Sequence, residues 1–142
     1  MATIQEFNKR LLTQGGATFN LNTGQLDFNK GFGVSLEEHE QVFLKDEYSD
    51  EDLKKFLSKH IELLYDLDLE LGGWIEGDKV YLDITEVVED KNEAIEKGVN
   101  RNQLAIFDFE NKEVIDLPPS QKTGTLTQQR AHKKLIIQKL TK

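Results

Sequence analysis

Cysteine is absent from this chain of 142 residues, and proline, methionine and tryptophan are scarce, with two, one and one copies. The lack of cysteine excludes disulfides, thiolate metal sites and cysteine nucleophiles, and is typical of a reducing compartment. No apolar run approaches the roughly 20 residues that a membrane-spanning helix needs, and the opening MATIQEFNKRLL lacks the apolar core of a secretory signal. We therefore expect a cytoplasmic protein that does not contact a membrane.

Acidic side chains are missing from the end of the chain, since all 26 of them lie at or before Asp116. The remainder carries six basic residues: Lys122, Arg130, Lys133, Lys134, Lys139 and Lys142. The first 116 residues therefore carry 12 − 26 = −14 and the remainder +6. A body with this negative charge repels phosphate backbones, so we expect direct nucleic-acid binding only through the tail. The candidate contacts in the tail are Arg130, Lys133 and Lys134. The favoured interpretation is a solvated acidic surface on which the tail docks.

The two prolines stand together, at Pro118 and Pro119. A chain of this length fits one domain, which buries about 68–70% of the surface of the unfolded chain. Because Pro-Pro interrupts regular structure and the following SQKTGTLT is typical of a linker, we expect an acidic α+β domain over residues 1–117. Residues 118–142 would form the linker and a basic C-terminal helical tail.

Two segments, residues 3–13 and 49–67, place apolar side chains at helical spacing. The second is the clearer helix, because Ser49 is a suitable N-cap and Asp52 stands at the capping-box position. Its apolar stripe comprises Leu53, Phe56, Leu57, Ile61 and Leu64. His60 lies at the edge of this stripe, so we interpret it as a boundary residue and not as a ligand or base.

The stretch GGWIEGDKVYLDITE, from Gly72 to Glu86, predicts a β-hairpin. Gly77-Asp78 suits a two-residue loop, which places Trp74 opposite Tyr81. Because strand side chains alternate, the apolar residues of the hairpin form a core face, and Trp74, Tyr81 and Asp83 share the other face. That second face is either packed or an open contact patch of the kind that protein interfaces favour, and we favour packing.

The segment from Gln103 to Phe109 predicts a second major strand, apolar on both faces and therefore central in a covered sheet. A short helix around residues 91–97 separates it from the hairpin, which favours a right-handed crossover between parallel strands. We therefore expect a compact α+β domain with a mixed sheet, one face of which is covered by the helix over residues 49–67.

Three groups of residues are weighed as chemical sites. Asp83 followed by Glu110 and Lys112 has the acid, acid, lysine order of metal-dependent nucleases, but the latter two fall in a predicted turn. A group of acids that also contains Asp83 lacks the ligand spacing of a calcium loop, and a solvated turn is the favoured interpretation. This group comprises Asp83, Glu86, Glu89 and Asp90. We expect no catalytic residue, metal or cofactor from these patterns.

Arg101, Asn102 and Gln103 precede the central strand, where they offer hydrogen-bond donors to a carboxylate or phosphate. The alternative is that they cap the end of the preceding helix and position the loop. We favour the structural role, and keep the three residues as candidates for a binding surface.

Two segments resemble a known family. GATFNLNTGQLDFNKGFGVSL, residues 16–36, and GGWIEGDKVYLDITEVVEDKNEAIEKGVNRNQLAIFDF, residues 72–109, resemble a small uncharacterised domain that recurs in proteins of bacteriophages and other mobile elements. The resemblance covers under half of the chain and does not include the basic tail. It implies a setting in an infected or host bacterial cell and implies no reaction mechanism.

Three hypotheses on function follow. The first is a non-enzymatic accessory protein that binds another phage or host protein through the Trp74, Tyr81 and Asp83 face or through the tail. The second is a counter-defence inhibitor whose acidic surface imitates nucleic acid. The third, with the least support, is a metal-dependent nuclease.

Overall fold

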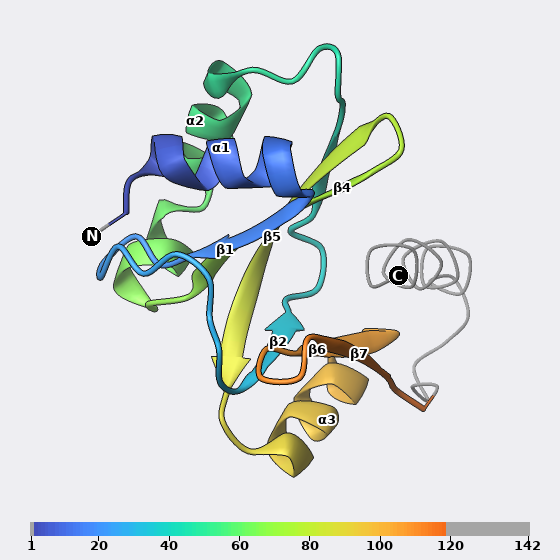
Figure 1. Ribbon diagram of the computed structural model, residues 1–142. Helices are drawn as coiled ribbons and strands as arrows, with labels where there is room; N and C mark the ends of the chain where they lie inside the picture. Colours follow the sequence, from blue (N-terminus) through green and yellow to red (C-terminus); the bar gives the residue numbers. More distant parts are fainter. Residues whose placement is uncertain (1, 119–142) are drawn as a thin grey trace. The chain divides into compact units, whose positions relative to one another are not determined.

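The computed structural model describes residues 2–118, which divide into two compact units (Figure 1). The described parts of the first are residues 2–27 and 39–85, and those of the second are residues 28–38 and 86–118. The predicted α+β class is confirmed, because helices accompany seven strands of an antiparallel sheet. The predicted tail, with Arg130, Lys133 and Lys134, lies outside the described residues.

The first unit begins with helix α1 (Ile4–Gln14), as predicted. Thr3 Oγ1 accepts a hydrogen bond from the Glu6 N–H at 3.2 Å, and Gly15 ends the helix with φ 87°, a left-handed conformation that suits glycine. Phe7 and Leu11 of α1 are fully buried. They pack where β4 carries Gly73, because a Cβ there would lie 2.9 Å from Phe7 Cζ. A residue without a side chain therefore lets α1 approach the sheet closely.

Helix α2 (Asp50–Lys59) has the predicted capping box, with the Ser49 N–H donating to Asp52 Oδ2 at 3.0 Å. The expected single helix over residues 49–67 changes its form after His60. A short π-helix, η1 (Glu62–Asp66), follows, and it closes with a bond from the Leu67 N–H to the Glu62 carbonyl at 3.0 Å. Leu53, Phe56 and Leu64 of the predicted apolar stripe are buried, but Ile61, at the start of this wider turn, is 43% exposed and does not belong to the buried stripe.

The strands of the first unit pair in the order β1-β4-β5-β3, and each recorded pair is antiparallel. Their bounds are β1 (Gly16–Phe19), β3 (Gln41–Leu44), β4 (Glu70–Glu76) and β5 (Lys79–Val88), the last three residues of which belong to the second unit. The predicted hairpin register is confirmed, since Trp74 pairs with Tyr81 and Ile75 with Val80. Gly77 in the loop has φ 59°, as a primed two-residue turn requires.

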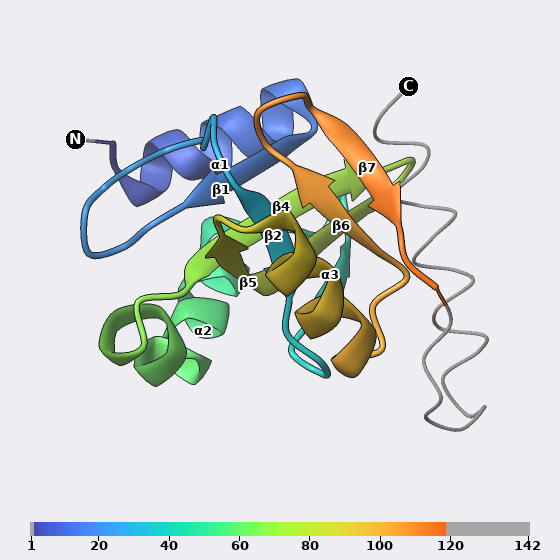
Figure 2. The same ribbon diagram turned by 90° about the horizontal axis from the view of Figure 1, so that it is seen from below.

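The second unit contains the strand order β2-β6-β7, with antiparallel pairs. Its elements are β2 (Phe32–Ser35), α3 (Lys91–Asn100), β6 (Ala105–Asp108) and β7 (Glu113–Asp116). Figure 2 shows α3 against β6. Val34, Val88, Ala94 and Ile106 form the core of this unit.

The expected parallel pairing between the hairpin and the Gln103–Phe109 strand is wrong. Strand β6 has β2 on one side and β7 on the other, so both of its edges are taken by antiparallel neighbours. Strand β2, from much earlier in the sequence, occupies the position beside β6 where a parallel crossover would have placed β5. The pairs recorded among the described residues are antiparallel, so the sheet is not the mixed sheet that we expected. Within the described residues, no helix is long and apolar enough to cross a bilayer.

Candidate functional site

Trp74 and Tyr81 form the centre of the hairpin face that the sequence singled out. Their rings stack with centroids 3.9 Å apart and planes 3° apart, as expected for side chains that lie opposite each other on neighbouring strands. Tyr81 is buried and Trp74 is half-buried. Burial, followed by the negative charges of Glu40, Glu76 and Asp78, raises the pKa of the Tyr81 hydroxyl. Tyr81 is therefore a neutral packing residue with acids nearby.

Asp83 lies on the same face, and it is buried. Thr85 Oγ1 donates to Asp83 Oδ1 at 3.0 Å, and Gly72 lies opposite on β4. A Cβ on Gly72 would collide with Asp83 Oδ1, so glycine makes room for this carboxylate. The face around Tyr81 and Asp83 is packed, as we favoured, and these two residues do not present an open patch.

Strand β3, which sequence reasoning missed, supplies the open part of this face. Val42 lies opposite Tyr81 and Leu44 opposite Lys79. Since residues opposite each other in an antiparallel pair point to the same face, Val42 extends the row that begins with Trp74 and Tyr81. Val42 is 47% exposed and Leu44 is 48% exposed. The run QVFL between acidic residues is the signal that would have indicated a short strand.

The outer side of β3 has no strand partner among the described residues. The Lys45 N–H donates to the Asp78 carbonyl at 2.6 Å, which continues the β3–β5 ladder. Because ladder bonds alternate along an antiparallel strand, the backbone groups of Gln41 and Phe43 point to β5 and those of Val42 and Leu44 point outward. The Leu44 carbonyl accepts bonds from the N–H groups of residues 47 and 48. Within residues 2–118, the N–H and carbonyl of Val42 and the N–H of Leu44 have no backbone partner, and with these two side chains they form what we call the β3 edge.

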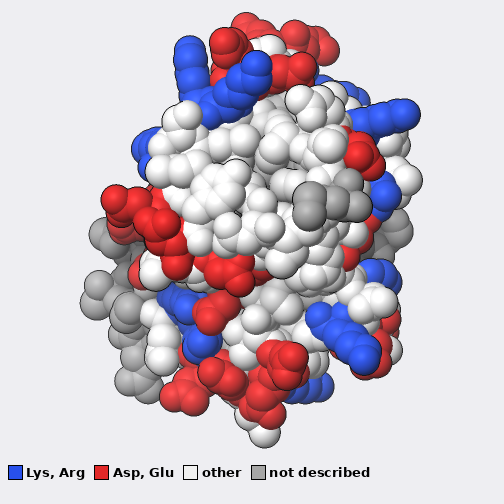
Figure 3. All heavy atoms as spheres, turned by 90° about the vertical axis from the view of Figure 1, so that its left-hand side faces the viewer, with Lys and Arg blue, Asp and Glu red and all other residues white. Residues whose placement is uncertain are grey.

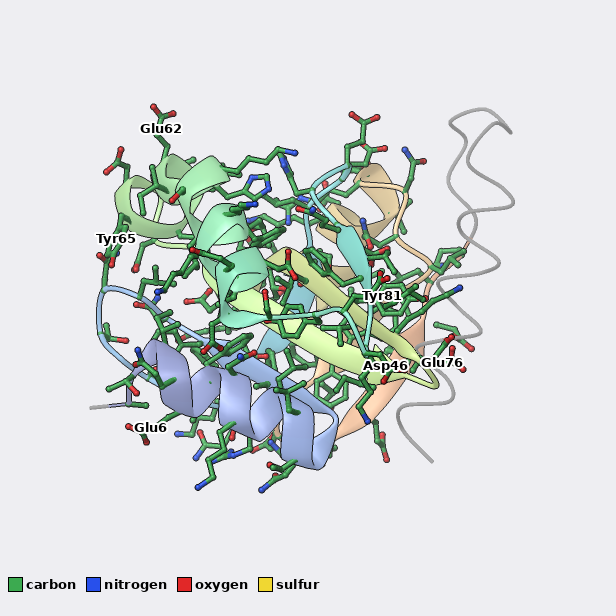
Figure 4. All side chains as sticks on the ribbon, turned by 90° about the horizontal axis from the view of Figure 1, so that it is seen from above. Glu6, Asp46, Glu62, Tyr65, Glu76 and Tyr81 are labelled. Atoms are coloured by element: carbon green, nitrogen blue, oxygen red, sulfur yellow. The ribbon has the colours of Figure 1, made fainter. Side chains whose placement is uncertain are left out.

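Acidic residues flank the β3 edge at both ends. Glu40 precedes the strand, and Asp46 follows Lys45. In Figure 4, Asp46 and Glu76 are seen at the end of the sheet where the hairpin carries Tyr81, whereas Tyr65 lies at the opposite end, on η1. Glu40 and Glu76 also raise the pKa of the Tyr81 hydroxyl, so these two acids lie near this face. The β3 edge is thus apolar at its centre with acids near both ends, and Lys45 and Lys79 stand beside the end nearer the hairpin loop.

The structure assigns Arg101, Asn102 and Gln103 to the end of α3, as the structural alternative predicted. Their N–H groups donate to the carbonyls of residues 97, 99 and 98 at 3.0, 3.1 and 2.9 Å. Asn102 has φ 55°, a left-handed conformation that asparagine tolerates, and its Nδ2 donates to a Glu37 carboxylate oxygen. Asn102 and Gln103 are buried. All three residues therefore help to end the helix and turn the chain into β6.

Arg101 already holds a carboxylate of this chain. Glu86 Oε1 accepts from Arg101 Nη2 at 2.6 Å, and Glu86 Oε2 accepts from Lys97 Nζ at 2.9 Å. Burial by itself would raise the pKa of Glu86, but the hydrogen bonds and charges of Lys97 and Arg101 outweigh it and lower this pKa. Of the donors that we considered for an external anion, Arg101 Nη2 is used by Glu86, Asn102 Nδ2 by Glu37 and Gln103 Nε2 by the Arg101 carbonyl. Arg101 Nη1 and Asn102 Oδ1 are buried without a hydrogen-bond partner in the described part of the chain.

Three residues of the nuclease and metal alternatives, Asp83, Lys112 and Asp90, have structural partners. Asp83 accepts from Thr85, and Lys112 Nζ donates to the Phe28 carbonyl at 3.0 Å. Asp90 caps α3 by accepting from the Glu93 N–H at 2.8 Å. In residues 2–118, no group of three or more His, Cys, Asp or Glu side chains is placed to hold a metal ion.

His60 is a packing residue at the end of α2, in agreement with its interpretation as a boundary residue. It is buried, and its ring lies 4.5 Å from the Phe56 ring and 5.2 Å from the His39 ring, centroid to centroid. Burial, with smaller effects of His39 and Lys59, lowers the pKa of His60. The neutral form therefore predominates at pH 7.

Comparison with known proteins finds no matching family model, curated protein or solved structure. The resemblance to a phage domain therefore stays a prediction.

Proposed function

We propose that this chain is a non-enzymatic protein-binding module whose contact surface is the β3 edge. The observation that carries this proposal is the exposure of Val42 and Leu44, at 47% and 48%, on a strand whose outer backbone groups have no strand partner in the described residues. Exposed apolar edge strands promote association, and natural proteins usually protect them unless they bind there. The half-buried Trp74, in the same row as Val42, extends the surface inward.

A counter-defence inhibitor that imitates nucleic acid is the second candidate. The charge of −14 in the first 116 residues, which is 12 − 26, favours it. Against it, Glu70, Asp83 and Asp108 are buried and cannot present their charge to a partner. Figure 3 also shows a broad uncharged area on one face, with both acidic and basic side chains at its margin. Salt dependence of binding separates this candidate from the first.

The test is quantitative affinity capture from a bacterial lysate, the source that the phage resemblance implies, followed by binding measurements with the purified partner. The double variant Val42→Lys/Leu44→Lys should weaken binding at least about tenfold, because it adds two charges at an apolar contact. Leu67→Lys is the matched control, since Leu67 is 63% exposed and lies beyond η1. A partner that binds the double variant as tightly as the wild type would show that the β3 edge is not the contact surface.

A further inference from the structure

We infer that the β3 edge binds an extended, basic segment of its protein partner as an additional β-strand. This inference rests on the proposed function and specifies the chemistry of the partner. Strand addition supplies main-chain hydrogen bonds at a sheet edge, with side chains at alternate positions giving specificity. The β3 edge has the backbone groups, the alternate apolar positions and the flanking charge that such a ligand needs.

The backbone supplies the first requirement. Val42 presents both its N–H and its carbonyl outward, so it can form the two reciprocal bonds of one ladder pair with an incoming residue. The outward N–H of Leu44 adds a further donor on the same side. These three backbone groups, on two residues separated by one, match the hydrogen-bonding pattern of a short extended segment.

The side chains supply the second requirement. Val42 and Leu44 point to one face, and residues of an added strand that lie opposite them point to that face as well. Phe43 points to the other face, where its ring lies 5.3 Å from the Tyr48 ring, so it belongs to the packing of this chain. The ligand should therefore carry apolar residues at two positions separated by one residue.

The charges supply the third requirement. Glu40 precedes β3 and Asp46 follows it after Lys45, and Glu76 and Asp78 lie at the tip of the hairpin. A segment along β3 therefore has acids near both of its ends. Basic residues on both sides of the two apolar positions complement these charges, and acidic residues there are repelled. Because Glu40 lies two residues before Val42 and Asp46 two residues after Leu44, the expected pattern is basic, any residue, apolar, any residue, apolar, any residue, basic.

A second copy of this chain fits the edge poorly. Outward backbone groups can pair only with outward groups, so Val42 of one copy would lie opposite either Val42 or Leu44 of the other. The first register brings Glu40 opposite Leu44, and the second brings Glu40 opposite Asp46. Neither register places Glu40 opposite Lys45, so self-pairing brings no opposite charge to the acids that flank β3. A basic partner segment does not have this conflict.

The experiment uses the full chain and three synthetic peptides. The first is Lys-Thr-Val-Thr-Val-Thr-Lys, the second replaces its two Lys by Glu, and the third is the first with N-methyl groups on the amides that would bond to β3. Trp74 is the single tryptophan, and its fluorescence reports on the row that ends at Val42. Amide chemical shifts of residues 40–46 locate the binding.

The Lys peptide should bind about tenfold more tightly than the Glu peptide, since the two exposed charge pairs with Glu40 and Asp46 change sign. N-methylation should remove binding, because it removes donors without changing charge. Val42→Pro, which removes one outward N–H and leaves the β5 ladder intact, should do the same, with Leu67→Lys as the neutral control. The N-methyl peptide keeps the test decisive if Val42→Pro does not fold.

Three results would overturn the inference. They are equal binding of the Lys and N-methyl peptides, equal binding of the Lys and Glu peptides, and shift changes confined to residues outside 40–46. A wild-type dimer that Val42→Pro converts into a monomer would identify a second copy as the occupant and overturn it as well. If the Lys/Lys double variant loses a captured partner while the peptides show no strand addition, the binding module stands and the mode of binding is wrong.

Discussion

Replacement of Gly98 by alanine sets helix propensity against packing in the last turns of α3. Alanine favours a helix interior over glycine by about 1 kcal/mol, so propensity alone predicts a more stable protein. In this fold, a Cβ at Gly98 would lie 2.5 Å from Leu117 Cδ1 and 3.0 Å from Ile106 Cγ2. Overpacking of this kind costs about 1–3 kcal/mol. We therefore expect Gly98→Ala to lower the free energy of unfolding by a net amount of about 0–2 kcal/mol.

Urea denaturation followed by far-UV circular dichroism measures this balance. Leu117→Ala removes the closest of the two contacts, so Gly98→Ala should cost less in that background, with a coupling energy of about 1 kcal/mol. Ile106 is buried and its methyl group is fixed on a β-branched carbon, so part of the cost should persist. An increase in stability on Gly98→Ala in the wild-type chain would refute the packing argument, because it would mean that both neighbours move aside without cost.

Two further substitutions test the contacts of the candidate residues. Glu86→Gln should destabilise the fold by about 1–3 kcal/mol at pH 7, because it weakens the bonds to Lys97 and Arg101. Since folding lowers the pKa of Glu86, its contribution is complete above the unfolded value of about 4.3 and is lost as pH falls through the folded value. Urea curves at pH 7 and 3.5 should thus show a smaller difference at the lower pH, and an equal difference at both would contradict this. Trp74→Ala should cost about 1–3 kcal/mol by circular dichroism, whereas Trp74→Phe, which keeps a ring over Tyr81, should recover most of the loss.

Local features of the fold could be predicted from the sequence because they depend on neighbouring residues. The two-residue loop at Gly77 fixes the register of the hairpin, so the pair Trp74 and Tyr81 follows from counting outward. The capping box of α2 depends on Ser49 and Asp52, three residues apart. In both cases the chemistry that decides the structure lies within a few positions.

Pairings between distant segments could not be predicted in this way. Strand β3 has four residues and pairs with β5 almost forty positions later in the chain. Its own sequence therefore does not indicate which residues of β5 lie opposite it. The place beside β6 is taken by Phe32 and Gly33 of β2, which no pattern around Gln103 indicates. The Trp74 face could be identified from alternation alone, but its open part could not, because that part belongs to the unpredicted strand.

Strand addition and nucleic-acid imitation differ in how many charges of this chain the partner contacts. This number distinguishes the two hypotheses better than the net charge does. Asp27 pairs with Arg10, Glu86 pairs with two cations, and Asp83 is buried, so these acids are engaged within the fold. Addition of a basic strand at the β3 edge involves only the few acids at its ends, and raising salt from about 50 to 200 mM should weaken it by about one order of magnitude. A nucleic-acid mimic must engage many more charges at once, so the same change in salt should weaken its binding by a clearly larger factor. A shallow salt dependence therefore favours strand addition even for a body that carries a charge of −14.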